Sequence, residues 1–173
     1  MYWINHPEET DDCRAVDETQ RRWYIKIEHY FKRRGVDMVR PIIKDIFFLQ
    51  QKSVPAGKAD LPIAADLQDT LKAHRNECVG MAANMIGFQK NIIIVSLGLM
   101  DLVMLNPAIT KKTGPYDAEE GCLSLTGTRK TRRYQNITVK YQDIKLQWHT
   151  QNFSGWPAQI IQHECDHLQG ILI

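Results

Sequence analysis

The sequence His-Glu-Cys-Asp-His at positions 163–167 constrains the fold more than any other feature of this chain. Residues four apart in a helix lie one above the other on the same face, so a helix here would present His163 and His167 to one metal ion. Glu164 would lie beside that face, where its carboxylate could act on a water molecule as a general base. The same spacing also arises by chance, so alone it leaves a metal site and an ordinary helix as equal alternatives.

A catalytic metal usually takes three protein ligands, so the remaining histidines and cysteines decide the matter. Cys78 and Cys165 are flanked by residues typical of a buried core, where a free cysteine is a small apolar side chain. Cys122 differs, because it follows the flexible Gly121 within the short segment 120–124. The other histidines lie in polar surroundings typical of surface or capping positions: His6, His29, His74 and His149.

Two motifs together give the chain a family resemblance. Glu-Gly-Cys-Leu-Ser at 120–124 and Gln-His-Glu-Cys-Asp-His-Leu at 162–168 resemble, in order and separation, the paired motifs of the peptide deformylase family. Met-Val-Arg-Pro-Ile-Ile at 38–43 resembles the start of such a protein. The resemblance therefore predicts a deformylase-like catalytic domain at 38–173 and a separate leader at 1–37.

The resemblance assigns a role to each matching position. It implies that Cys122, His163 and His167 bind the metal and that Glu164 is the general acid and base. It implies that the backbone N–H of Leu123 stabilises the oxyanion. One divalent ion is expected, Fe²⁺ in the cell, with Zn²⁺, Ni²⁺ or Co²⁺ able to substitute in a site of one thiolate and two imidazoles.

The resemblance also implies a substrate and a place of action. The expected activity is hydrolysis of the formyl amide at N-formylmethionyl ends of nascent polypeptides, at the ribosome in the bacterial cytoplasm. The peptide would lie as an extended strand against Val79 and Gly80. Met85 and Gly121 complete the expected substrate-binding set.

One family motif is altered. The family pattern Gly-x-Gly-Leu-Ala-Ala-x-Gln becomes Cys-Val-Gly-Met-Ala-Ala-Asn-Met at 78–85. A glutamine amide can donate a hydrogen bond to the oxyanion, whereas the thioether of Met85 cannot. Losing one such donor costs about 10²–10³ in rate. We expect Met85 to be a core residue, and the Asn84 amide, one residue early, to point elsewhere.

Other positions near the motifs carry weaker expectations. Trp156 and Gln159 stand where the family usually has aliphatic pocket residues, so either they face solvent or the substrate preference has changed. Asp166 is expected to hold a ring nitrogen of a metal-binding histidine or to stabilise the helix. Glu120 and Arg129 either form a charge pair that steadies the cysteine segment, or Arg129 is simply solvated.

Composition excludes several classes of protein. The 173 residues suit a single core, and the net charge of +2 is too small to indicate nucleic acid or an anionic membrane. No apolar run approaches the ~20 residues of a membrane span, and no signal peptide is expected. Four cysteines without a paired framework favour a reducing cytoplasm.

Hydrophobic periodicity predicts an α+β fold, with antiparallel β-sheets packed around a central C-terminal helix that carries the His-Glu-x-x-His motif. The amphipathic pattern at 18–34 predicts a helix that packs on the domain or on a partner subunit, which would give an oligomer. The other expected helices are 60–75 and the last one, to about residue 169. The expected strands are 91–97, 102–105, 137–142 and 144–148.

Two alternatives to the hydrolase stay open at this level. Met85 and the altered pocket residues fit a catalytically weakened, metal-binding relative that binds N-termini or a partner. Against that alternative stands Glu164, which a pure binder does not need. A general His-Glu-x-x-His peptidase is the third alternative, and the short chain leaves it little room for a long cleft.

Overall fold

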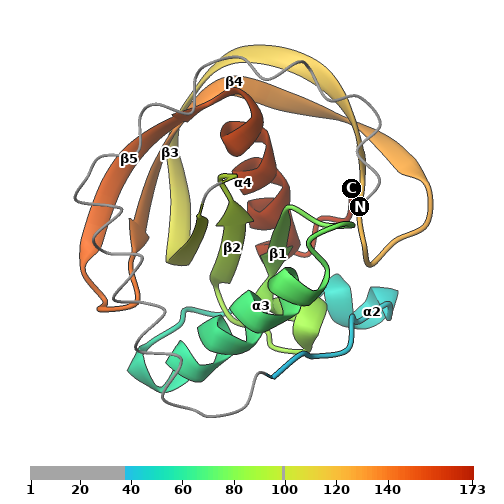
Figure 1. The fold of residues 1–173 in the computed structure, drawn as a ribbon. Helices are drawn as coiled ribbons and strands as arrows, with labels where there is room; N and C mark the ends of the chain where they lie inside the picture. Colours follow the sequence, from blue (N-terminus) through green and yellow to red (C-terminus); the bar gives the residue numbers. More distant parts are fainter. Residues whose placement is uncertain (1–37, 99) are drawn as a thin grey trace.

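A single antiparallel sheet forms the centre of the molecule in the computed structural model, which describes residues 38–98 and 100–173. Its strands follow one another in chain order and curve around the last helix (Figure 1). The α+β prediction is therefore confirmed, with one sheet in the described part of the chain. The strands are β1 (Gly80–Ala82), β2 (Ile92–Ser96), β3 (Asp101–Gly121), β4 (Thr128–Gln142) and β5 (Trp148–Ser154). The helices are α2 (Ile46–Leu49), α3 (Leu61–Ala73) and α4 (Gly155–Leu168), with 3-10 turns η2 (Lys58–Asp60) and η3 (Ala83–Ile86).

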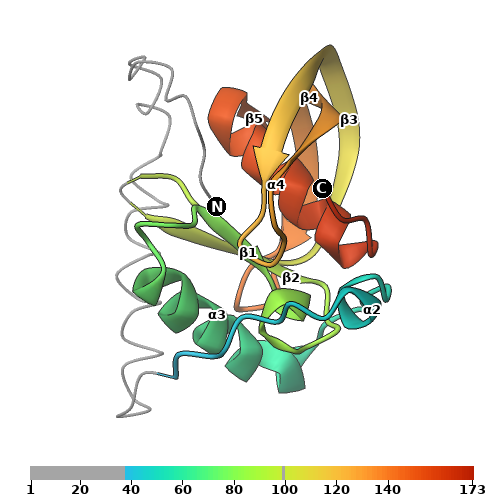
Figure 2. The ribbon, with the colours of Figure 1, turned by 90° about the vertical axis from the view of Figure 1, so that its right-hand side faces the viewer.

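The strand β2 is buried on both faces. Ile92 and Ile94 belong to the core cluster that includes α3, whereas Ile93 and Val95 belong to the cluster that includes α4. This explains its unbroken run of β-branched residues, which is typical of a strand covered on both sides. Figure 2 shows α3 and α4 on either side of β1 and β2. The predicted strand 91–97 is thus the central layer of the domain.

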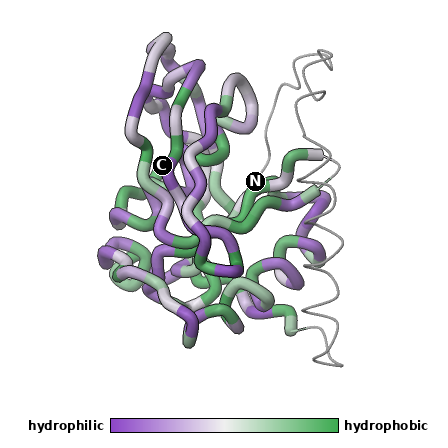
Figure 3. The backbone as a smooth tube through the Cα atoms, turned by 90° about the vertical axis from the view of Figure 1, so that its left-hand side faces the viewer, coloured by the Kyte–Doolittle hydropathy of each residue, from purple (hydrophilic) through white to green (hydrophobic). Residues whose placement is uncertain are grey.

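The hairpin of β3 and β4 is much longer than the sequence predicts. β3 runs from Asp101 to Gly121 rather than over 102–105, and much of its middle is exposed to solvent. Its pairing with β4 shifts register twice, and Asn106 takes a positive φ of 53° beside the first shift. Bulges of this kind bend a strand, which agrees with the arch that the two strands form over α4 (Figure 1). Figure 3 shows long hydrophilic stretches along this arch.

The predicted strand at 144–148 is wrong in position. Residues after Asp143 form a turn, because its Oδ1 accepts hydrogen bonds from the backbone N–H groups of Lys145 (2.8 Å) and Gln147 (2.9 Å). The last strand, β5, begins only at Trp148. An aspartate that closes a turn on its own backbone competes with strand formation, so the strand after the turn starts later than apolar alternation suggested, whereas β4 ends at Gln142 as predicted.

The last helix, α4, places the motif at the centre of the fold. It has Pro157 in its first turn, as expected, and packs Ile160 and Ile161 into the cluster shared with β2 and β4. The helix predicted within 18–34 lies outside the described residues. Among the described helices, none combines the length and apolarity required to cross a membrane.

The contact between β1 and α4 gives a first prediction. A Cβ atom added at Gly80 would lie 2.6 Å from Ile160 Cγ2 and 2.8 Å from Glu164 Oε1. We expect Gly80→Ala to lower the free energy of unfolding by about 1–3 kcal/mol, because such overpacking forces neighbours to move. Urea denaturation measures this change.

Gly57→Ala is the matched control, since a Cβ there meets nothing within 4 Å. It should change stability by less than about 0.5 kcal/mol. Equal stabilities of the two variants would contradict the close packing of β1 on α4.

Candidate metal centre

Three candidate ligands form one buried cluster. One donor atom from each of Cys122, His163 and His167 lies within 4.8 Å of the others, and all three residues are buried. The two histidines come from consecutive turns of α4, with ring centroids 5.0 Å apart. Cys122 follows the last residue of β3, and its Sγ lies 3.2 Å from Nε2 of His167. The cluster thus joins the end of the arch to the middle of α4.

The orientation of each imidazole is defined by its neighbours. Nδ1 of His163 lies 2.9 Å from Oε2 of Glu120, which leaves Nε2 as the ring nitrogen that can bind a metal. In His167, Nε2 faces the thiol while Nδ1 is buried and has no hydrogen-bond partner among the described residues. The donor set is therefore one sulfur and two imidazole Nε2 atoms.

Glu164 is an isolated carboxyl group next to this cluster. It is fully buried, and neither of its oxygens has a hydrogen-bond partner in the described part of the chain. Burial raises the pKa of Glu164 to about 7, against the opposing effect of His163. A buried polar group without partners is costly, and a carboxyl group with a pKa near neutrality suits proton transfer.

These residues fit a divalent metal ion. Thiol and imidazole groups are ligands that suit Fe²⁺, Zn²⁺, Co²⁺ and Ni²⁺, and here the three donor atoms lie within 4.8 Å of one another. Three protein ligands leave a position for water or substrate, and the unsatisfied oxygens of Glu164 lie nearby. We conclude that the cluster can hold a catalytic rather than a closed structural metal.

An ion pair that the sequence did not reveal supports the cluster. Arg133 donates to both oxygens of Glu120, through Nε at 2.8 Å and Nη2 at 2.7 Å, and donates to Asp166 through Nη1 at 2.6 Å. Asp166 therefore reaches His163 only indirectly, through Arg133 and Glu120. Burial alone would raise the pKa of Glu120, but hydrogen bonds from Arg133 and His163 lower it to about 2.

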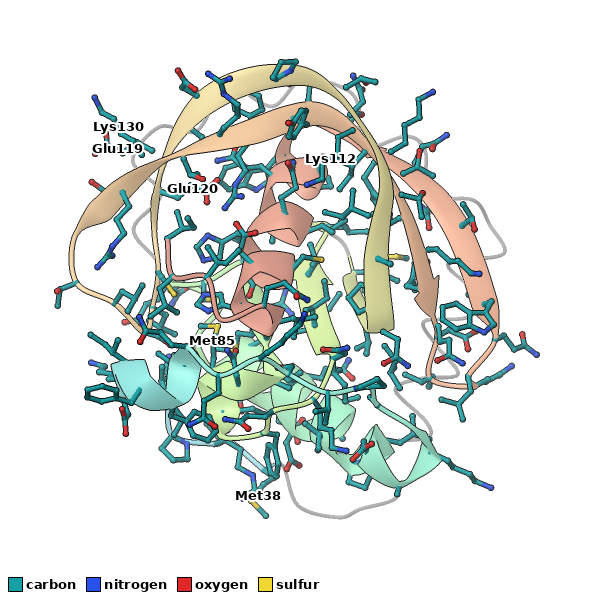
Figure 4. The ribbon with its side chains drawn as sticks, turned by 180° about the vertical axis from the view of Figure 1, so that it is seen from behind. Met38, Met85, Lys112, Glu119, Glu120 and Lys130 are labelled. Carbon is teal, nitrogen blue, oxygen red and sulfur yellow. The ribbon has the colours of Figure 1, made fainter. Side chains whose placement is uncertain are left out.

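Of the two alternatives for Arg129, the structure shows the solvated residue and not the charge pair with Glu120. The two residues are paired in register across β3 and β4, but Arg129 is exposed and binds the carbonyl of Thr126. Arg133 occurs four residues later in the same basic run, where β4 faces α4. Only the curvature of the arch identifies Arg133 as the ion-pair partner of Glu120. Figure 4 shows Glu120 directed toward α4, whereas Glu119 and Lys130 point outward.

The expected substrate-binding residues lie around the cluster. Gly80 packs directly on α4 at Glu164, as described above, and Val79 precedes it as a half-buried residue. Gly121 is the last residue of β3, and Leu123 packs on the cluster of apolar side chains that contains Cys122. The structure thus places Gly80 against α4 at Glu164, while Gly121 and Leu123 flank the ligand Cys122 in the chain.

Met85 is a buried residue of the same apolar cluster as Cys122. Its Sδ accepts from the backbone N–H of Ala82 at 3.5 Å, and Figure 4 shows it near one end of α4. The amide of Asn84 points elsewhere, as expected, because its Nδ2 donates to the carbonyl of His167 at 2.8 Å. Asn84 therefore supports the end of α4.

Gln159 does not simply face solvent, because it is half-buried between β3 and α4. Its amide is hydrogen-bonded on both sides, to Tyr116 and to Glu120, each at 2.9 Å. Trp156 is half-buried and packs against the apolar cluster of α4. No sequence signal pointed to Tyr116, which lies in a stretch that reads as a loop.

Comparisons with known proteins relate the chain to one family in sequence and in fold. The family model described as polypeptide deformylase matches residues 42–173. A peptide deformylase of Clostridium beijerinckii is 52% identical over 136 residues, which are 79% of this chain and all of that protein. Solved relatives include an Acinetobacter baumannii peptide deformylase bound to Met-Ala-Ser (TM-score 0.70, 30% identity, 79% of this chain and 97% of that one). The Thermus thermophilus peptide deformylase is similar (TM-score 0.70, 32% identity, 78% and 83%).

Two neighbouring arginines test the buried ion pair. Arg133 and Glu120 have side chains 4% and 0% exposed, whereas Arg132 and its partner Asp117 are 66% and 79% exposed. We expect Arg133→Met to lower the free energy of unfolding by about 3–5 kcal/mol, because it leaves a buried carboxylate uncompensated. Arg132→Met should cost less than about 1 kcal/mol. Similar urea denaturation midpoints for the two variants would contradict this role of Arg133.

Metal affinity should rise with pH. Burial opposes the charged form of His163, but hydrogen bonds with Cys122 and Glu120 raise its pKa to about 10 in the metal-free protein. A proton must therefore leave His163 before a metal binds, so the Kd for Co²⁺ should fall by up to about tenfold per pH unit between about pH 6 and about pH 9. Calorimetry in buffers of different ionisation enthalpy counts the protons released. A pH-independent Kd would contradict the protonated resting state.

Proposed function

This chain belongs to the peptide deformylase family, and from that premise we propose that Cys122, His163 and His167 hold its catalytic metal while Glu164 transfers the proton. The protein is a metal-dependent hydrolase that removes N-formyl groups from nascent polypeptides. One observation carries the assignment of residues: three convergent buried donors lie beside a fully buried carboxyl group with no partner of its own among the described residues.

The proposed reaction assigns proton transfer to Glu164. Water attacks the formyl carbon and Glu164 takes a proton from it, and the carboxyl group then gives that proton to the leaving amine nitrogen. The C–N bond breaks, and the products are formate and a free N-terminus. When bound, a divalent ion supplies Lewis acidity toward the formyl oxygen and lowers the pKa of water. The backbone N–H of Leu123 donates to the formyl oxygen as its charge develops.

The substrate would bind along β1. This strand lies at one end of the described sheet and pairs only with β2 there. An extended peptide can add to such an edge through main-chain hydrogen bonds, and Val79 and Gly80 supply them in this proposal. Gly80 also allows close approach to Glu164, because any side chain at this position would meet the carboxylate. In this proposal Gly121, the last residue of β3, borders the same space.

Because residue 85 is methionine and not glutamine, the site has one hydrogen-bond donor fewer for the oxyanion. The residue is buried in the same apolar cluster as Cys122, and its thioether offers no N–H group. The alternative of a binding protein without useful activity rests on this residue and on the altered pocket positions Trp156 and Gln159. The family membership favours the hydrolase over that alternative and over a general peptidase.

The finer assignments are proposals. Fe²⁺ suits a site of one thiolate and two imidazoles as the metal used in the cell. The free Cys78, Cys122 and Cys165 support a reducing cytoplasm, where nascent chains at the ribosome would be the substrate. Because the family model begins at residue 42, we propose 38–173 as the catalytic domain and 1–37 as a leader whose segment 18–34 mediates oligomerisation.

Replacing the proposed base gives a direct test. Glu164→Gln should reduce formate release from formyl-Met-Ala-Ser by about 10²–10⁴ without loss of bound metal, since only the proton acceptor is removed. Glu77→Gln, in the exposed turn that follows α3, is the control and should behave as wild type. Turnover of Glu164→Gln at the wild-type rate, with metal content equal, would exclude Glu164 as the base.

Restoring a donor at position 85 tests the weakened oxyanion site. Met85→Gln should raise kcat by about tenfold or more, because one oxyanion hydrogen bond contributes about 10²–10³ in other hydrolases. Met85→Leu keeps the apolar packing without adding a donor and should give no gain. If both variants have the wild-type kcat, position 85 does not face the reacting oxygen.

A further inference from the structure

Gln159 connects the arch to the metal-binding helix at a point where the family resemblance leads one to expect an aliphatic residue. It lies on α4 one turn before His163, on the same face of the helix. The hydroxyl of Tyr116, on β3, donates to its Oε1 at 2.9 Å, and its Nε2 donates to Oε1 of Glu120 at 2.9 Å. The amide therefore bridges β3 and the carboxylate that holds His163.

The Glu120 carboxylate has four donors and about four acceptor sites. Arg133 uses one site on each oxygen, His163 contacts Oε2 at 2.9 Å, and Gln159 completes Oε1. A carboxylate held by four hydrogen-bond donors cannot rotate without breaking several of these hydrogen bonds. Gln159 thus limits the rotation that would move Oε2 away from Nδ1 of His163.

The direction of the bridge is fixed by its chemistry. A carboxylate accepts hydrogen bonds only, so the amide must present Nε2 to Glu120 and Oε1 to Tyr116. Burial, and next the charge of Glu120, raise the pKa of Tyr116, so its phenol keeps the proton that it donates. Leucine or isoleucine at position 159 would leave both the phenol and one acceptor site of Glu120 without these partners.

We propose that Gln159, oriented by Tyr116, is a positioning residue that fixes Glu120 and thereby the His163 imidazole for metal binding. The inference rests on the metal centre proposed above, and it adds a residue that is not one of the proposed ligands. Groups that hold a ligand from behind typically change metal affinity or activity by about 10–100-fold when removed. The rate at which the protein loses its metal should therefore depend on the side-chain amide of Gln159, although this amide is not a metal ligand.

The test is the rate of Co²⁺ release from loaded protein to excess chelator, followed by the thiolate-to-Co²⁺ charge-transfer absorption. Gln159→Met keeps the length of the side chain and removes both hydrogen bonds, and it should release Co²⁺ about tenfold faster than wild type. Tyr116→Phe should have a smaller effect in the same direction. Because Tyr116 acts through Gln159, the double variant should release Co²⁺ at the rate of Gln159→Met.

Tyr141→Phe is the matched control, since its hydroxyl donates to Gln151 Oε1 at 3.0 Å, between β4 and β5. It should release Co²⁺ at the wild-type rate. The proposal would be overturned if Gln159→Met released Co²⁺ at the wild-type rate. It would also be overturned if the increases in release rate caused by the two single substitutions multiplied in the double variant. If Gln159→Met does not fold, a wild-type rate for Tyr116→Phe overturns it. Absence of thiolate absorption in wild-type protein would instead reject the metal centre, and this inference with it.

Discussion

The buried carboxylate of Glu120 is the interaction on which the site depends. It is fully removed from solvent at the end of β3 and is held by Arg133 of β4 and by His163 and Gln159 of α4. A buried charge is tolerated only when it is paired and fully hydrogen-bonded, so the carboxylate requires the arch to lie on α4 in one arrangement. That arrangement also brings Cys122, two residues after Glu120, to the histidines. One set of contacts thus fixes both the fold and the ligand geometry.

The sequence predicted the elements whose apolar pattern is strong and failed where it is weak. The helix expected at 60–75 and the strand at 91–97 correspond to α3 and β2, because both bury continuous apolar faces. The exposed half of β3 was missed, since its lysines, Gly114 and Pro115 are typical of a loop. These residues form a strand because β4 pairs with them, which is a tertiary effect. The shift of β5 has a local cause in the turn closed by Asp143.

The candidate ligands on α4 followed from helical periodicity, whereas their supports did not. Spacing alone placed His163 and His167 on one face, and Cys122 was assigned through the family motif. Whether Arg133 or Arg129 pairs with Glu120 depends on which residues of the bent strand β4 face α4. A single sequence gives no visible signal for that bend. The bridge formed by Gln159 was missed for the same reason, because Tyr116 is distant in sequence and reaches it only through the arch.

The most direct test of the central claim is X-ray absorption spectroscopy of the Zn²⁺-loaded protein. The structure predicts one sulfur scatterer at about 2.3 Å and two imidazole nitrogens at about 2.0–2.1 Å, with one further light atom from water. Cys122→Ser should remove the sulfur contribution, whereas Cys78→Ser and Cys165→Ser should leave it unchanged. A spectrum without sulfur, or one in which a second cysteine binds, would contradict a site made of Cys122, His163 and His167.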